Sequence, residues 1–252
     1  MKKTLFACLL FLLTTFLGFT KIDHFSKGML LECRPEKTQK LFDFCLINEI
    51  AKKPVYYIGN GEEAIAFATS DDKYVLKFFL KRQILKKLFF KPKKKFKQVF
   101  LKDNEILTGF ESLKKYEMAL TALPDETGVL AVHAGESVEK LPICKLIDYR
   151  GKEHLVDLNR VAFVVQKKAK IINKRMLTES VNQQLQELFS GISGKGYIST
   201  SPTFNPENFA ILDNKGVMID VGKLEYVPDK AYGIEEEKFL KRYERWVSKK
   251  AG

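Results

Sequence analysis

Short apolar runs separated by turn-forming residues dominate the chain after its first 20 residues. Three of these runs follow one another closely, at residues 55–58, 65–69 and 74–80. The connecting segments carry Gly59-Asn60-Gly61 and Ser70-Asp71-Asp72-Lys73. Apolar runs of this length, bounded by Gly, Asn and Asp, are typical of strands joined by turns. The pattern therefore predicts three consecutive strands.

The remaining hydrophobic pattern predicts helices mixed with further strands, and hence an α+β fold. Apolar residues three and four positions apart indicate helices, and shorter apolar runs indicate strands. Thr178 or Ser180 is suited to cap the second helix. Residues 21–53 look like a partly helical lead-in. The helices are expected at 103–122, 178–192 and 234–249, and the further strands at 128–133, 143–149 and 161–166.

A late hairpin carries the most informative polar residues. Two apolar runs, 208–212 and 217–222, flank the turn Asp213-Asn214-Lys215-Gly216. Asn208 opens the first run, and Asp220 lies near the end of the second. Because a hairpin brings its two ends together, the oxygen atoms of Asn208 and Asp220 can point at one place. This arrangement resembles the one in which the protein-kinase-like superfamily holds magnesium, so the resemblance implies that Asn208 and Asp220 are the metal ligands.

The order of motifs over roughly residues 54–222 resembles the protein-kinase-like superfamily. The segment 58–66 is similar to its glycine-rich loop, with Gly59 and Gly61 present and Ala64 in place of the third glycine. The resemblance implies a two-lobe fold and a site for ATP and Mg²⁺, in which Gly59 and Gly61 let the main chain approach phosphates. A plain hairpin turn would explain the same glycines.

Lys77 interrupts an apolar strand, where an unpaired ammonium group is costly. It shares one face of the strand with Val75 and Phe79. Its position resembles that of the phosphate-binding Lys in the kinase V-A-I-K strand. The alternative is an edge-strand lysine that points into solvent.

A kinase lysine is paired with a Glu of the following helix, and two residues compete for this role. Helical phase puts Glu117 within the apolar stripe of the helix at 103–122, and Glu111 nearly opposite it. We therefore expect Glu117 rather than Glu111 to pair with Lys77.

The resemblance also implies a division of the chain. Residues 161–166 resemble the strand that leads to the hinge, where main-chain groups would meet an adenine. The expected N-lobe is 54–166 and the expected C-lobe 167–252. We expect this C-lobe to be reduced, because only a short segment follows Gly222.

The catalytic position departs from the kinase pattern. The H-R-D-x-x-x-x-N motif would place its catalytic Asp at Thr203, and no Asp occurs between Leu158 and Leu212. A hydroxyl cannot accept a proton near neutral pH as a carboxylate can. The sequence therefore favours a pseudokinase that binds nucleotide weakly or acts as a scaffold. The alternative is an active atypical phosphotransferase on a small-molecule, sugar or lipid substrate, since phosphoryl transfer depends mainly on positioning and charge.

The N-terminus and the charge balance indicate a membrane surface. Lys2 and Lys3 precede the uncharged run 4–20, which predicts export or a membrane anchor through residues 1–20. The formal net charge is +12, and residues 82–102 are basic and apolar without any acidic residue. Such a segment is typical of contact with anionic lipid. A solvated insertion would look similar, and the motifs of nucleic-acid-binding modules are absent.

A third reading is a basic membrane-surface binding protein without a nucleotide site. No particular protein partner is indicated. The four Cys and three His have no metal-binding spacing, which argues against a zinc or haem site.

Overall fold

A computed structural model describes residues 25–37, 43–61, 63–81, 104–137, 139–173, 176, 178–201, 204–227 and 229–248. Three predictions lie outside these residues: the targeting segment 1–20, the basic segment 82–102 and the role of Thr203. Within the described part of the chain, no helix combines the length and the apolar character needed to cross a bilayer.

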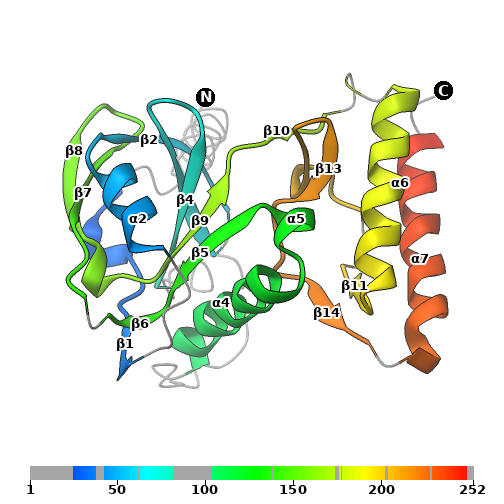
Figure 1. Cartoon of the computed structure of the whole chain (residues 1–252), viewed down its shortest axis with the longest axis horizontal. Helices are drawn as coiled ribbons and strands as arrows, with labels where there is room; N and C mark the ends of the chain where they lie inside the picture. The colour runs from blue at the N-terminus through cyan, green and yellow to red at the C-terminus, as the bar shows by residue number, and fades with distance from the viewer. Residues whose placement is uncertain are drawn as a thin grey trace, which may run out of the picture.

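A seven-stranded sheet forms the N-terminal part of the structure (Figure 1). Its strands are β2 (Val55–Asn60), β3 (Ala64–Thr69), β4 (Tyr74–Phe79), β5 (Val129–His133), β7 (Ile143–Ile147), β8 (Glu153–Asp157) and β9 (Phe163–Lys167). Their order across the sheet is β5-β9-β4-β3-β2-β7-β8. Only β2 and β7 run parallel within this sheet; the other neighbours are antiparallel.

The six strands expected from the apolar runs are confirmed, and β8 is an additional strand. The two buried side chains of β8 are His154 and Val156. His154 lies 2.8 Å from the carboxylate of Asp148, which satisfies a polar ring inside the protein. Because a histidine occupies one of its two buried positions, β8 lacks the apolar alternation that marks the other strands.

The two faces of the sheet pack against different helices. Leu76 and Phe78 of β4 belong to the core that packs against α2 (Phe44–Ala51). Phe79 belongs to the second core, on the face covered by α4 (Asn104–Ala122). Because alternate side chains of a strand point to opposite faces, Lys77 shares the α4 face with Phe79. β4 lies between β9 and β3, which excludes the alternative of an edge-strand lysine.

The helix α4 confirms the expected helix at 103–122 and lies along β5 (Figure 1). It buries Phe110, Leu113, Tyr116 and Ala119. The ring of Tyr116 meets that of Phe79 edge-on, with 5.8 Å between centroids. A short helix, α5 (Pro124–Thr127), follows directly.

The segment 25–37 completes the sheet region. The short helix η1 (Lys27–Met29) leads to Leu30 and Leu31, which are both buried. The main chain of Leu31 accepts a hydrogen bond from the N–H of Ala162 and donates one to the carbonyl of Phe79, each at 2.8 Å. β1 (Arg34–Lys37) then pairs in parallel with β6 (Gly135–Glu136).

The C-terminal part contains two helices and two small sheets. In one sheet β12 (Phe209–Leu212) lies between β10 (Lys170–Ile171) and β13 (Lys215–Met218), and in the other β11 (Tyr197–Ser199) pairs with β14 (Leu224–Tyr226). The helices α6 (Glu179–Gly194) and α7 (Asp229–Ser248) run side by side (Figure 1). Thr178 caps α6, as predicted, and α7 begins earlier than expected.

The hairpin β12–β13 has a two-residue turn. Asp213 and Asn214 have φ values of 49° and 61°, which are the positive values that a tight hairpin turn requires. Gly216, expected in the turn, lies in β13, where an added Cβ would come within 2.5 Å of the carbonyl oxygen of Gln184 in α6. Glycine is therefore needed there for close packing of the strand on the helix.

Candidate functional site

Lys77 reaches from β4 toward the hairpin β12–β13. Its ammonium group donates a hydrogen bond to the main-chain carbonyl of Ile219 and lies 3.3 Å from the phenolic oxygen of Tyr116. Burial lowers the pKa of Lys77 to about 8, and the charge of Asp220 opposes this shift. One lysine thus joins the sheet, the helix α4 and the hairpin.

Tyr116 occupies the position on α4 that faces Lys77. Its hydroxyl oxygen also lies 3.4 Å from the carbonyl oxygen of Ile219. Burial raises its pKa well above the ordinary value, and the negative charges of Asp220 and Glu63 add to this effect. The side chain is therefore a neutral phenol at every pH at which the protein is expected to function.

The expected ion pair between Lys77 and Glu117 is not formed. Among the described residues, the ion pairs include none between Lys77 and either Glu117 or Glu111. Glu117 is half-buried, and burial raises its pKa while the charges of Arg34 and Lys114 lower it.

The error lies in the phase assigned to α4. The predicted stripe contained Phe110 and Leu113, which are buried, and also included position 117. The buried face instead continues on the other side of Leu113, to Tyr116 and Ala119. Counting Tyr116 as an apolar residue would have shifted the predicted stripe toward the correct face.

The glycine-rich loop is tied to α4 by a contact that the sequence did not reveal. Ser112 is buried one turn before Tyr116 and donates a hydrogen bond to the carboxylate of Glu63. Glu63 lies in the connection between β2 and β3, where the N–H of Gly61 also donates to the carbonyl of Ala64 at 2.8 Å. Ser112 and Tyr116 thus put two hydroxyl groups on the helix face that meets the loop and Lys77.

Gly59 and Gly61 have free space around them. An added Cβ at Gly59 would meet no atom within 4 Å, and one at Gly61 would meet only the Ala64 oxygen at 3.8 Å. Neither glycine has a positive φ. The described structure therefore does not itself require glycine at these two positions.

Asn208 and Asp220 lie at the paired ends of the hairpin. The carbonyl of Asn208 accepts hydrogen bonds from the N–H groups of Ile219 at 2.8 Å and Asp220 at 3.4 Å. The side-chain oxygen of Asn208 accepts from Asn205 at 3.3 Å, and the carboxylate of Asp220 accepts from the N–H of Gly222 at 3.0 Å. Asn208 and Asp220 therefore flank Ile219, whose carbonyl receives Lys77.

A metal at this end would draw on these two side chains. Asp220 is exposed and Asn208 half-buried, and both present oxygen atoms, the donor type that Mg²⁺ prefers. Among the described residues, those of this site included, no cluster of three or more His, Cys, Asp or Glu could hold a metal ion. The residues present thus fit a magnesium ion held partly by a ligand.

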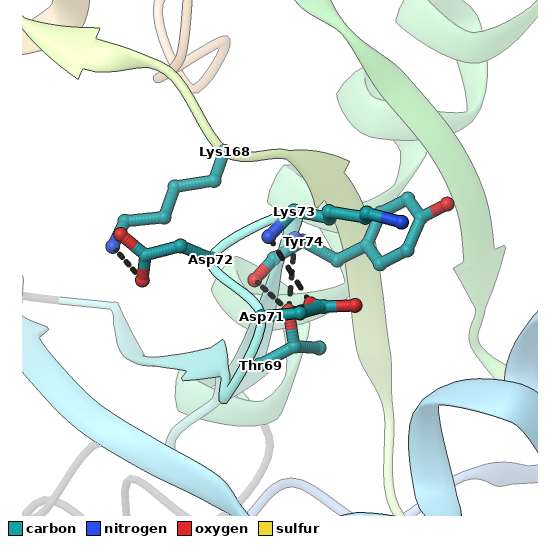
Figure 2. Close-up of polar contacts among 6 residues, drawn as sticks. All are labelled: Thr69, Asp71, Asp72, Lys73, Tyr74 and Lys168. Atoms are coloured by element: carbon teal, nitrogen blue, oxygen red, sulfur yellow. Dashed lines mark hydrogen bonds and ion pairs between the residues drawn. The ribbon is translucent and has the colours of Figure 1, made fainter.

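The segment after β9 is held to the turn between β3 and β4 (Figure 2). The N–H of Lys168 donates to the carbonyl of Lys73 at 2.8 Å, and the ammonium group of Lys168 pairs with Asp72. Thr69 in turn donates to Asp71 at 2.6 Å. The main-chain N–H of Lys168, two residues after the expected hinge strand 161–166, is therefore already bonded within the protein.

No described protein family matches the sequence, and no curated protein matches it. A 2.2 Å crystal structure of WbdD superposes with a TM-score of 0.39 and 15% identity, covering 72% of this chain and 36% of that chain. A medium-resolution structure of the bifunctional kinase-methyltransferase WbdD gives a TM-score of 0.38 and 14% identity, covering 70% and 34%. The chain spans about a third of the length of these solved chains.

Proposed function

We propose that the protein is a kinase-like domain at a membrane surface that binds a nucleotide and transfers phosphate poorly or not at all. The observation that carries this proposal is the convergence of Lys77, Tyr116 and the Ile219–Asp220 segment, from three separate elements, beside the glycine-containing loop. A lysine enclosed at the meeting point of a sheet, a helix and a hairpin is suited to hold phosphate.

An aromatic side chain on the sheet face that carries Lys77 supports a binding site for the nucleobase of a nucleotide. Lys77 pairs with Ala66 of β3, and Ala68 on the same strand pairs with Tyr56 of β2, so Tyr56 shares this face. Tyr56 is 45% exposed. An exposed aromatic side chain beyond the lysine suits contact with a planar ring. Gly59 and Gly61, which have free space around them, would let phosphates approach the main chain.

The hairpin end supports a metal that accompanies the nucleotide. Asn208 and Asp220 would hold Mg²⁺, which would offset the charge of the phosphates. The charge of Asp220 raises the pKa of Lys77, which supports a site in which both groups act on one ligand.

The proposed loss of phosphoryl transfer is inferred from the sequence around Thr203. No Asp occurs between Leu158 and Asn208, where a catalytic Asp would lie. Loss of a general base reduces a rate by about 10²–10⁴-fold, so weak residual turnover is compatible with the proposal. Glu207, beside Asn208, is exposed and is the nearest acidic residue in the sequence.

Thermal unfolding with ADP or ATP, with and without Mg²⁺, tests the binding. We expect nucleotide to raise the melting temperature, and Lys77→Met to abolish the rise. The matched control is Lys145→Met, at an ion-paired lysine on β7 of the same sheet. Asp220→Asn should remove only the increment that Mg²⁺ adds. Its control is Asp213→Asn in the turn of the same hairpin, where Asn tolerates a positive φ.

Turnover assays separate the alternatives. Robust phosphorylation of a sugar, lipid or peptide that Asp220→Ala abolishes would make the protein an active atypical phosphotransferase. The absence of any nucleotide effect in both assays would instead favour a basic membrane-surface binding protein without a nucleotide site.

A further inference from the structure

The ammonium group of Lys77 is surrounded by neutral oxygen atoms. Its two hydrogen-bond partners among the described residues are the carbonyl of Ile219 and the phenol of Tyr116. An ammonium group has three N–H donors, so these partners leave one for a ligand. The ion pairs of the described residues do not include Lys77, so no carboxylate neutralises it by direct contact.

The acidic residues of the neighbouring elements are otherwise engaged or exposed. Glu63, from the glycine-containing loop, accepts a hydrogen bond from Ser112 of α4. Asp220, from the hairpin, is exposed and accepts from Gly222. Glu117 lies near the charges of Arg34 and Lys114. Asp220 is the one acidic group whose charge acts appreciably on Lys77.

We infer that Tyr116 makes this site a receptor for a polyphosphate group that needs no bound metal. The inference rests on the proposed nucleotide site and concerns what decides its ligand. A carboxylate at position 116 would neutralise the ammonium group, and a polyphosphate would then depend on a metal for its charge balance. The neutral phenol holds Lys77 in place through the shared Ile219 carbonyl and leaves the positive charge to the ligand. Tyr116 is thus a specificity-determining residue.

The test compares Tyr116→Gln with Tyr116→Glu, two side chains of equal length that differ in charge. Both variants lose the aromatic ring, so their difference reports the charge at position 116. Binding of ADP and of inorganic tripolyphosphate is measured by calorimetry on the full chain, in EDTA and in excess Mg²⁺. Thermal unfolding without ligand checks that each variant is folded.

In EDTA, we expect the wild-type protein to bind ADP and tripolyphosphate with affinities within about tenfold of those in Mg²⁺, because Lys77 supplies the charge. Tyr116→Gln should keep this metal-free binding. Tyr116→Glu should weaken the metal-free affinity by at least about tenfold, and Mg²⁺ should reduce the difference in affinity between this variant and the wild type. Asp220→Asn should leave metal-free binding intact or strengthen it, since it removes a negative charge near the phosphates.

Equal affinities of the Gln and Glu variants in EDTA would overturn the inference, as would wild-type binding that requires Mg²⁺. If ADP binds only when Mg²⁺ is present, this inference is wrong and the proposed function stands. If ADP binds under neither condition, the proposed function itself is wrong. If neither Tyr116 variant folds, the wild-type comparison in EDTA against Lys77→Gln decides. If the wild type binds ADP in EDTA and Lys77→Gln does not, the result supports the inference. If Lys77→Gln still binds ADP in EDTA, the result contradicts it.

Discussion

Lys77 on β4 donates a hydrogen bond to the main-chain carbonyl of Ile219, a residue 142 positions later in the chain. The contact joins the sheet to the hairpin β12–β13 at the point where Asn208 and Asp220 meet. It also encloses a charged group, which burial penalises. The pKa of Lys77 falls to about 8 as a result, although Asp220 counteracts part of the effect.

Replacing Lys77 with Met should stabilise the folded protein near pH 7. Below pH 8 the lysine is protonated in both states, and its burial disfavours the folded one. Between pH 8 and about 10.5 only the unfolded chain keeps the proton, so the free energy of unfolding of the wild type rises with pH. We expect the free energy of unfolding of Lys77→Met to exceed that of the wild type by on the order of 2 kcal/mol at pH 7, and this difference to shrink above pH 8.

Urea unfolding of both proteins at several pH values from 7 to 10 measures this difference. Lys145→Met serves as the control, because its lysine is 41% exposed and lies 3.0 Å from Glu153. A difference between wild type and Lys77→Met that stays constant over this range would contradict the prediction.

Two glycine substitutions should differ in their effect on stability. Gly216→Ala forces a Cβ to within 2.5 Å of the Gln184 carbonyl and should cost about 1–3 kcal/mol of stability. Gly59→Ala has free space and a compatible φ, so its effect on stability should stay within about 0.5 kcal/mol. Chemical denaturation measures both values. Gly59→Ala should still weaken ADP binding severalfold if phosphates approach the loop, and unchanged binding would contradict that role.

Ser112→Ala should loosen the glycine-containing loop. The substitution removes the hydrogen bond that Ser112 donates to Glu63. Since Glu63 is exposed and water can replace the lost donor, the cost in stability should be about 1 kcal/mol. Amide hydrogen exchange at Gly61 and Leu80, whose N–H groups bond within and beside the loop, should become faster. Ser70→Ala at the exposed turn between β3 and β4 is the control, and equal exchange rates in both variants would exclude the effect.

The basic segment 82–102 is expected to attract anionic lipid. Replacing Lys93, Lys94, Lys95 and Lys97 with Gln should weaken binding of the full chain to vesicles that contain phosphatidylserine, and should flatten its salt dependence. Each lysine near the surface contributes about 1 kcal/mol of attraction. Vesicle sedimentation at low and moderate salt measures the change. Equal binding to neutral and anionic vesicles would rule out this role.

The strands and helices were largely predictable because their signals are local. Short apolar runs, three of them separated by turns rich in Gly, Asn and Asp, located six strands of the large sheet, and 3.6-residue periodicity located α4 and α6. The strand β8 escaped because His154, which Asp148 stabilises, occupies one of its two buried positions. The alternation of β4 also fixed the face on which Lys77 lies, since that depends only on the pleat of the strand.

The sequence by itself determined that a lysine, two loop glycines and an Asn–Asp hairpin follow one another in this chain. The tertiary structure decided what the lysine meets: the phenol of Tyr116 and the carbonyl of Ile219, and not the carboxylate of Glu117. A tyrosine can count as polar or apolar, so the helical phase derived from the sequence can be wrong by about one residue. Here that shift replaces the charged Glu117 by the neutral Tyr116 as the partner of Lys77. The contact with Ile219 could not be predicted from a local pattern, because every residue has a main-chain carbonyl and the sequence does not show which of them Lys77 reaches.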